Sequence, residues 1–264
     1  MSRVIYLYGF VPVGTPAPPA EVRGIAETPL QLLDLGAVSA VVSQLPEGEY
    51  SAGVIESRLD DLAWVGAQGV AHERVVVWFA DHAEILPARM FSIYSGEAAL
   101  RSAVAGELRH LAEQLSSLSG MREWNLKVAY DADQLARHGP EVSAELRRID
   151  REIAAAPPGR RYLLERQRAE TVKDEVARAA RALAGELLDA LRTHAADVRV
   201  LPVTAGDDAG AVVLNAALLV PRTAEIALRD HAGELYERHT SLGMIVTFSG
   251  PWAPYRFVEQ NGET

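Results

Sequence analysis

The chain has 264 residues, 48% of them hydrophobic and 23% charged, which is the composition of a folded globular protein with one large domain or two small ones. Its formal net charge of −10 opposes binding to nucleic acid and to anionic membrane surfaces. The absence of cysteine excludes disulfides and thiolate catalysis, and no apolar run reaches the roughly 18–20 residues of a membrane-spanning helix. Residues 4–8 read as a strand rather than as an export signal, so we expect a cytoplasmic protein.

Strands dominate the start of the chain. Residues 3–11 predict a first strand, and residues 13–27, rich in proline, predict an exposed loop. Residues 30–45 predict a second strand region with a break at Leu35-Gly36, and residues 46–49 predict a loop.

A helix is expected from about Gly53. Apolar or small residues that step by 4, 3, 4 and 4 predict one buried face, formed by Ile55, Leu59, Leu62, Gly66 and Val70. The β-branched run 75–79 favours a strand locally, but nothing breaks the helix after Val70, so we expect the helix to continue through it.

The next elements complete a predicted first domain. A strand over residues 85–94 is followed by a helix that begins at Ser95, ends at Gly120 and carries a regular leucine stripe. A strand over residues 123–130 comes next. This order predicts a helix-backed antiparallel sheet of a modified ferredoxin-like kind over residues 1–132.

Residues 133–195 predict a helical hairpin that links two domains. A short charged helix with apolar positions between Val142 and Ile153 ends at the turn 156–159. A longer helix over residues 162–193 follows, with a narrow apolar stripe and a highly charged surface.

Residues 196–264 predict a second α+β domain. Strands over residues 198–204 and 211–220 flank a turn at 205–210, Thr223 can cap a helix, and a strand from Met244 closes the unit. The predicted fold class is therefore α+β, with two modified ferredoxin-like domains joined by the hairpin.

Known catalytic patterns are absent from the sequence. It contains no Gly-x-Ser-x-Gly elbow, no Walker motif and no Gly-x-Gly-x-x-Gly loop. The seven histidines are scattered, and His231 and His239, two turns apart on one helix, favour a surface position over a metal site. The adjacent carboxylates of Asp60-Asp61 and Asp207-Asp208 favour solvated surface. We therefore predict no catalytic residue, no cofactor and no metal site.

An aromatic arm follows the last strand. Ser249-Gly250-Pro251 stops the strand, and flanking prolines hold the next residues extended. Three large rings, Trp252, Tyr255 and Phe257, then fall within six residues. Packing on the protein's own domain is favoured over docking on another protein, and the second alternative makes these rings the candidate partner-binding residues.

Residues 248–257, Phe-Ser-Gly-Pro-Trp-Ala-Pro-Tyr-Arg-Phe, resemble the GPWPPYxF ending of the gas vesicle accessory proteins of the F/L family, with Ala253 in place of one proline. Further segments resemble the family's motifs in the same order: 4–11, 71–75, 85–89, 123–128, 158–164 and 215–220. One departure is at 89–92, where Met90 and Phe91 stand in place of phenylalanine and glycine.

This resemblance implies a role in gas vesicle formation. Members of the family are similar to minor structural or assembly proteins that engage the small hydrophobic shell protein and other accessory proteins during vesicle nucleation. The resemblance implies two α+β domains joined through helices and no catalytic residues. It also implies that the protein is found with gas vesicles in the cytoplasm.

Two other functions stay open on the residues alone. The first is a small-molecule binder or enzyme with an interdomain pocket around Arg89, Glu123 and Lys127, since charged side chains on strands near a domain seam can orient a ligand. The second is a structural oligomer built through the stripe at 162–193.

Overall fold

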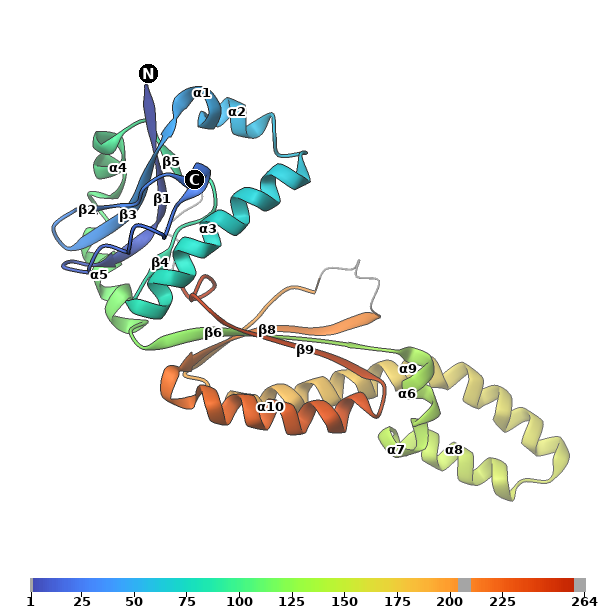
Figure 1. The fold of residues 1–264 in the computed structure, drawn as a ribbon. Coiled ribbons are helices and arrows are strands. Elements are labelled where there is room, and N and C mark those ends of the chain that lie inside the picture. Colours follow the sequence, from blue (N-terminus) through green and yellow to red (C-terminus); the bar gives the residue numbers. More distant parts are fainter. Residues whose placement is uncertain (1, 204–209, 259–264) are drawn as a thin grey trace. The chain divides into compact units, whose positions relative to one another are not determined.

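The computed structural model describes residues 2–203 and 210–258 (Figure 1). The chain forms two compact units, the first made of Met1–Arg122 and Pro251–Thr264 and the second of Glu123–Gly250. Each unit has an antiparallel sheet and helices. Apart from Gly210, the turn expected at 205–210 lies outside the described residues.

The sheet of the first unit has the strand order β2-β3-β1-β4, and β5 also pairs with β1. Its strands are β1 (Arg3–Pro12), β2 (Gln31–Asp34), β3 (Val38–Pro46), β4 (Leu86–Pro87) and β5 (Ile93–Tyr94). The long pairing of β1 with β3 shifts register between Leu7 and Gly9. The first strand and the break at Leu35-Gly36 are therefore as predicted.

Helices cover both faces of this sheet. They are η1 (Ile25–Glu27), α1 (Glu47–Tyr50), α2 (Ala52–Glu56), α3 (Leu62–His82), α4 (Glu97–Val104) and α5 (Leu108–Ser117). Successive side chains of β1 point to opposite faces. Tyr6 packs with Val76 of α3, and Leu7 packs in a separate core with Leu100 of α4. Helices therefore lie on both faces of this sheet, whereas the sequence predicted a helix-backed antiparallel sheet of a modified ferredoxin-like kind.

The apolar stripe predicted from Ile55 to Val70 is wrong. Residues 46–49 were expected as a loop, but 47–49 lie in α1, and α2 ends at Glu56. α3 begins afresh at Leu62, where the Asp61 side chain accepts a hydrogen bond from the backbone of Trp64. Because α3 is a separate helix, its buried face does not continue that of α2. Leu62 is therefore 82% exposed and Val70 is 66% exposed.

Other elements of this unit are shorter than predicted. The run 75–79 is helical, as expected. The strand predicted over residues 85–94 is reduced to β4 and β5 with an irregular segment between them. The helix predicted from Ser95 to Gly120 is divided into α4 and α5, and Gly96 rather than Ser95 occupies its N-cap position.

The sheet of the second unit has the order β7-β8-β6-β9. Its strands are β6 (Met121–Tyr130), β7 (Asp197–Val200), β8 (Ala211–Pro221) and β9 (Met244–Trp252). The predicted division at residues 132 and 195 thus differs from the observed units, because β6 lies between β8 and β9 instead of closing the first sheet. Local sequence identifies a strand but not the sheet that the strand joins.

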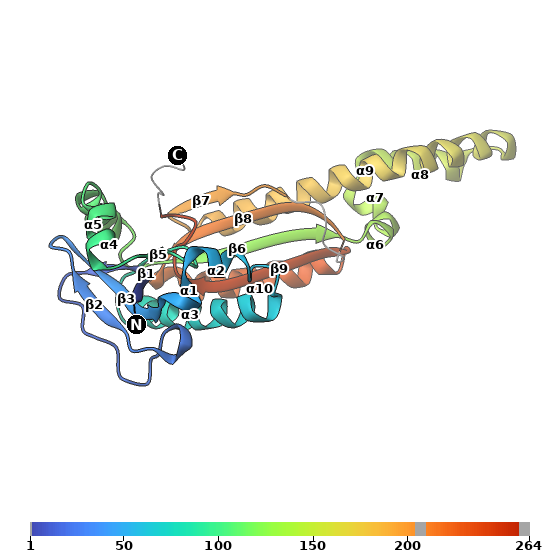
Figure 2. The same ribbon diagram turned by 90° about the horizontal axis from the view of Figure 1, so that it is seen from above.

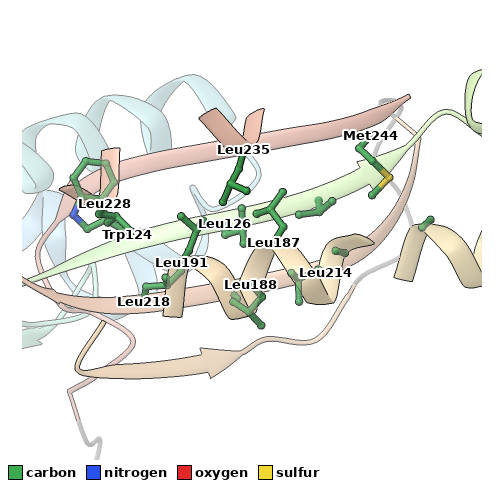
Figure 3. Close-up of a cluster of buried hydrophobic side chains, with 14 of the residues drawn as sticks. Trp124, Leu126, Leu187, Leu188, Leu191, Leu214, Leu218, Leu228, Leu235 and Met244 are labelled. Atoms are coloured by element: carbon green, nitrogen blue, oxygen red, sulfur yellow. The ribbon is translucent and has the colours of Figure 1, made fainter. Parts of the chain in front are cut away.

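Two helices pack on one face of this second sheet: α9 (Pro158–Arg192) and α10 (Glu225–Thr240), the latter preceded by η2 (Arg222–Ala224). Figure 3 shows their shared core, in which Leu187 and Leu191 of α9 and Leu228 of α10 meet Leu126 and Leu218 of the strands. The connectivity is strand, helical segment, strand, strand, helix, strand.

Shorter helices precede α9 inside this unit: α6 (Ala132–Arg137), α7 (Gly139–Val142) and α8 (Ala144–Ala155). α8 lies alongside the first half of α9 (Figure 2). Arg168 forms an ion pair with Asp150 at 2.5 Å, and the hydroxyl of Ser143 donates to Glu175 at 2.8 Å. The helical segment 133–195 therefore contributes to the second unit, whose core includes α9. Among the described residues, no helix is long and apolar enough to span a membrane.

Candidate functional site

The three rings of the aromatic arm differ in their exposure to solvent. Phe257 is buried and Tyr255 is half-buried, whereas Trp252 is 37% exposed. Ala253 between them is buried in the core that α3 forms with β1. Two of the three candidate partner-binding rings are thus packed on the first unit, and Trp252 is the most accessible of them.

Tyr255 joins two segments far apart in the sequence. Its hydroxyl donates a hydrogen bond to a carboxylate oxygen of Glu73 on α3, at 2.8 Å. Glu73 lies in the segment 71–75 and Tyr255 in the segment 248–257, both of which carry the motifs described above. The spacing of neither motif indicated this contact, because 182 residues separate the two side chains.

A cluster of buried polar rings lies beside this contact in the first unit. The Tyr6 hydroxyl is 2.8 Å from Nδ1 of His72, and the Tyr8 hydroxyl is 3.0 Å from the Ser43 hydroxyl. Tyr8 also accepts a hydrogen bond from the backbone of Ile25 at 2.7 Å. The cluster ties β1, β3 and α3 together through side chains that a hydrophobic pattern does not identify.

Burial sets the protonation of this cluster. Burial lowers the pKa of His72 to about 4, and a hydrogen bond with the Ala88 backbone opposes this effect only in part. Burial also raises the pKa of Tyr6 and of Tyr8. Because Tyr6 accepts a hydrogen bond from the backbone of Phe91 at 3.1 Å, we assign its proton to the bond with His72. His72 is then a neutral imidazole, protonated at Nε2, and serves as a structural acceptor.

Phe91 is held in an unfavourable backbone conformation. Its φ is +65°, a region that large L-residues rarely adopt. Its amide donates to Tyr6, and its ring stacks on Trp64 with centroids 5.5 Å apart and planes 5° apart. The guanidinium of Arg58 lies 4.2 Å from the centre of the Trp64 ring. These contacts explain how phenylalanine is accommodated where the motif has glycine.

An apolar groove of about 540 Å³, which we call the first groove, lies beside this stack. Apolar and half-buried side chains dominate its lining: Val4, Ala52, Ile55, Leu59, Phe91, Ile93 and Tyr94. Glu47 and Glu56 from α1 and α2 also line it, together with Ser51 and Ser95. The groove is an apolar surface bordered by carboxylates.

A second groove, of about 480 Å³, lies between α10 and the edge strand β9. Trp124 and Phe248 stack there with centroids 5.0 Å apart, next to Ala232, Gly233 and Tyr236 of α10. Trp124 is almost fully buried, and its indole N–H has no hydrogen-bond partner in the described part of the chain.

The residues of the predicted interdomain pocket lie in different units. Arg89 is exposed between β4 and β5 of the first unit. Glu123, which is buried, and Lys127, which is half-buried, lie on β6 of the second unit. The three residues therefore do not form a pocket inside either unit.

Histidines form one close pair, His194 and His231, with ring nitrogens 3.1 Å apart. His239 is buried rather than at the surface as expected, and its Nδ1 lies 2.8 Å from the Leu235 carbonyl. No group of three or more potential metal ligands occurs among residues 2–203 and 210–258.

The chain matches one protein family over almost all of its length. The profile of the family described as "Gas vesicle synthesis protein GvpL/GvpF" matches residues 4–259. Gas vesicle protein L of Streptomyces sp. (strain CB03234) is 28% identical, over 97% of this chain and 93% of that protein. Gas vesicle protein F of the same strain is 26% identical, over 96% of this chain and 99% of that protein.

Solved structures share the fold. The crystal structure of GvpF from Anabaena sp. PCC7120 covers 99% of this chain and 100% of its own, with a TM-score of 0.70 and 17% identity. The crystal structure of GvpF from Microcystis aeruginosa aligns with 97% of this chain and 99% of its own chain, with a TM-score of 0.68 and 19% sequence identity. On the match over residues 4–259, the chain belongs to the GvpL/GvpF family of gas vesicle synthesis proteins.

Proposed function

We propose that this protein acts in gas vesicle formation as a minor structural or assembly protein without catalytic activity. In this role it binds the small hydrophobic shell protein and other accessory proteins during vesicle nucleation, in the cytoplasm and at the growing vesicle. The observation that carries the proposal is the family match from residue 4 to residue 259.

Contact surfaces, rather than a reactive centre, support a binding role. His72, whose pKa is lowered by burial, is neutral and is hydrogen-bonded to Tyr6 within the core. Both grooves are lined mainly by apolar side chains. Apolar grooves of this kind suit transient shielding of an aggregation-prone hydrophobic subunit.

The topology of the second unit supports its assignment as a ferredoxin-like unit. We infer that it is a modified ferredoxin-like unit, because strands and helices alternate as βαββαβ when α6 to α9 count as one helical connection. Its sheet order β7-β8-β6-β9 and the common core with α9 and α10 support this inference.

Deletion and complementation in a vesicle-forming host test the proposed function. In a host that carries a complete gas vesicle gene cluster, the corresponding family gene is removed and this chain is supplied instead. We expect restored vesicles, scored by cell buoyancy and by light scattering that disappears under pressure. Vesicle formation that is equally efficient with and without any family member would contradict the proposal.

A further inference from the structure

We infer that the first groove is the docking site for a basic amphipathic segment of the shell protein, in which apolar residues are bordered by lysine or arginine. This inference rests on the proposed function and adds to it the surface used and the chemistry of the docked segment. It is carried by the apolar lining of the groove, by the charge of its border and by the anchoring of Phe91.

The lining supplies hydrophobic contact. Leu59 is 48% exposed, and Phe91, Ile93 and Tyr94 are only partly buried, so apolar area remains available to a partner. Aromatic and aliphatic side chains at the centre of a concave surface are the usual anchors of protein–protein contacts. The groove therefore favours apolar side chains of a partner.

The border supplies selectivity through charge. Residues 47–61 contain five carboxylates, at positions 47, 49, 56, 60 and 61, and one basic residue, Arg58. Arg58 is already placed over Trp64. Glu47 and Glu56 are exposed, and neither forms an ion pair with another described residue. An acidic border attracts basic partners, speeds their association and disfavours acidic ones.

The anchoring of Phe91 gives a rigid contact. Its amide is held by Tyr6 and its ring by Trp64, although its φ of +65° is unfavourable. Residues in such conformations persist when their surroundings determine them and are frequent at binding sites. A preorganised ring loses little rotational freedom when a partner docks, which favours affinity.

The test measures binding of the full chain to purified shell protein kept soluble as a fusion. We expect Glu47→Lys/Glu56→Lys to weaken binding about tenfold or more, with a reduced salt dependence. Phe91→Gly should weaken it to a similar degree or more, because the ring is an anchor. The matched control is Glu186→Lys/Asp189→Lys on α9, which changes net charge by the same amount on exposed positions and should leave binding within about twofold.

Thermal unfolding of each variant checks that the fold is retained. Wild-type protein that binds the shell protein, together with groove variants that bind equally well, would overturn this inference and leave the proposed function standing. Equal loss in the groove variants and in the α9 control would also overturn it, since attraction would then depend on net charge alone. A wild-type dimer that the groove variants dissociate would assign the groove to a second copy of the chain. Wild-type protein that does not bind the shell protein would instead contradict the proposed function.

Discussion

The hydroxyl of Tyr6 lies 2.8 Å from Nδ1 of His72, deep in the first unit, and this hydrogen bond links the central strand β1 to α3. The same hydroxyl holds the amide of Phe91 at the first groove. A buried core contact thus helps to position the partly buried Phe91, which lines the groove.

The pH dependence of stability should report on His72. Its pKa is lowered to about 4 in the folded protein, whereas an unfolded histidine titrates near 6.5. As pH falls through 6.5 the unfolded state binds a proton that the folded state does not bind, so stability is lost between about pH 6.5 and pH 4. His72→Gln keeps an acceptor for Tyr6 but does not titrate. We expect the wild type to lose about 2 kcal/mol more than this variant between pH 7 and pH 5, measured by urea unfolding. Identical pH profiles would show that His72 is not held neutral.

Phe91 allows backbone strain to be separated from side-chain contact. Phe91→Ala and Phe91→Gly both remove the ring that stacks on Trp64, but only glycine adopts a φ of +65° without strain. We expect the glycine variant to be more stable than the alanine variant by about 1 kcal/mol in free energy of unfolding. The opposite order would mean that the positive φ is not retained in solution.

Gly250, in the segment that resembles the family's ending, should be required for structural reasons. Its φ is +147°, and a Cβ atom there would lie 2.9 Å from the Glu123 carbonyl and from the Trp124 ring. Gly250→Ala should therefore lower the free energy of unfolding by roughly 1–3 kcal/mol. Gly233 in α10 has open space around it, so Gly233→Ala should raise stability by up to about 1 kcal/mol. An unchanged free energy of unfolding in Gly250→Ala would contradict the close approach of Gly250 to Glu123 and Trp124.

The bond from Tyr255 to Glu73 should secure the aromatic arm. Tyr255→Phe removes a hydroxyl that donates to a carboxylate at 2.8 Å, and we expect a loss of roughly 1–2 kcal/mol in chemical unfolding. Tyr162→Phe is the matched control, because Tyr162 is 68% exposed and should be neutral. Equal stabilities of the two variants would argue against an attached arm.

The sequence predicted many elements but not their assembly. The strand at 3–11 is present, as its β-branched and aromatic content predicted, and so is the strand at 123–130, which alternation predicted. Residues 75–79 are helical, as expected from the absence of a helix break after Val70. The prediction of one apolar stripe from Ile55 to Val70 was wrong, because a turn at 57–61 separates two helices whose buried faces are not continuous. The buried face of α3 instead includes Gln68 and His72, which bond to Tyr50 and Tyr6. Polar pairs of this kind are invisible to a hydrophobic pattern.

The aromatic arm shows a similar limit for the site. Three rings within six residues predicted packing on their own C-terminal domain, but Tyr255 and Phe257 pack in the first unit instead. Residues of the first groove were not predicted together, because α2, β5 and the backbone conformation of Phe91 bring distant positions side by side. The departure from the motif at Phe91 was visible in the sequence, but it did not indicate a groove.

Direct binding of the small hydrophobic shell protein by the isolated full chain tests the central claim most closely. The measurement is fluorescence anisotropy of a labelled, soluble shell-protein fusion titrated with this protein, with the fusion partner alone as the control. We expect saturable binding with a dissociation constant in about the micromolar range or tighter, reversed by unlabelled shell protein. No binding at about 100 μM protein, or equal binding to the fusion partner alone, would contradict the account.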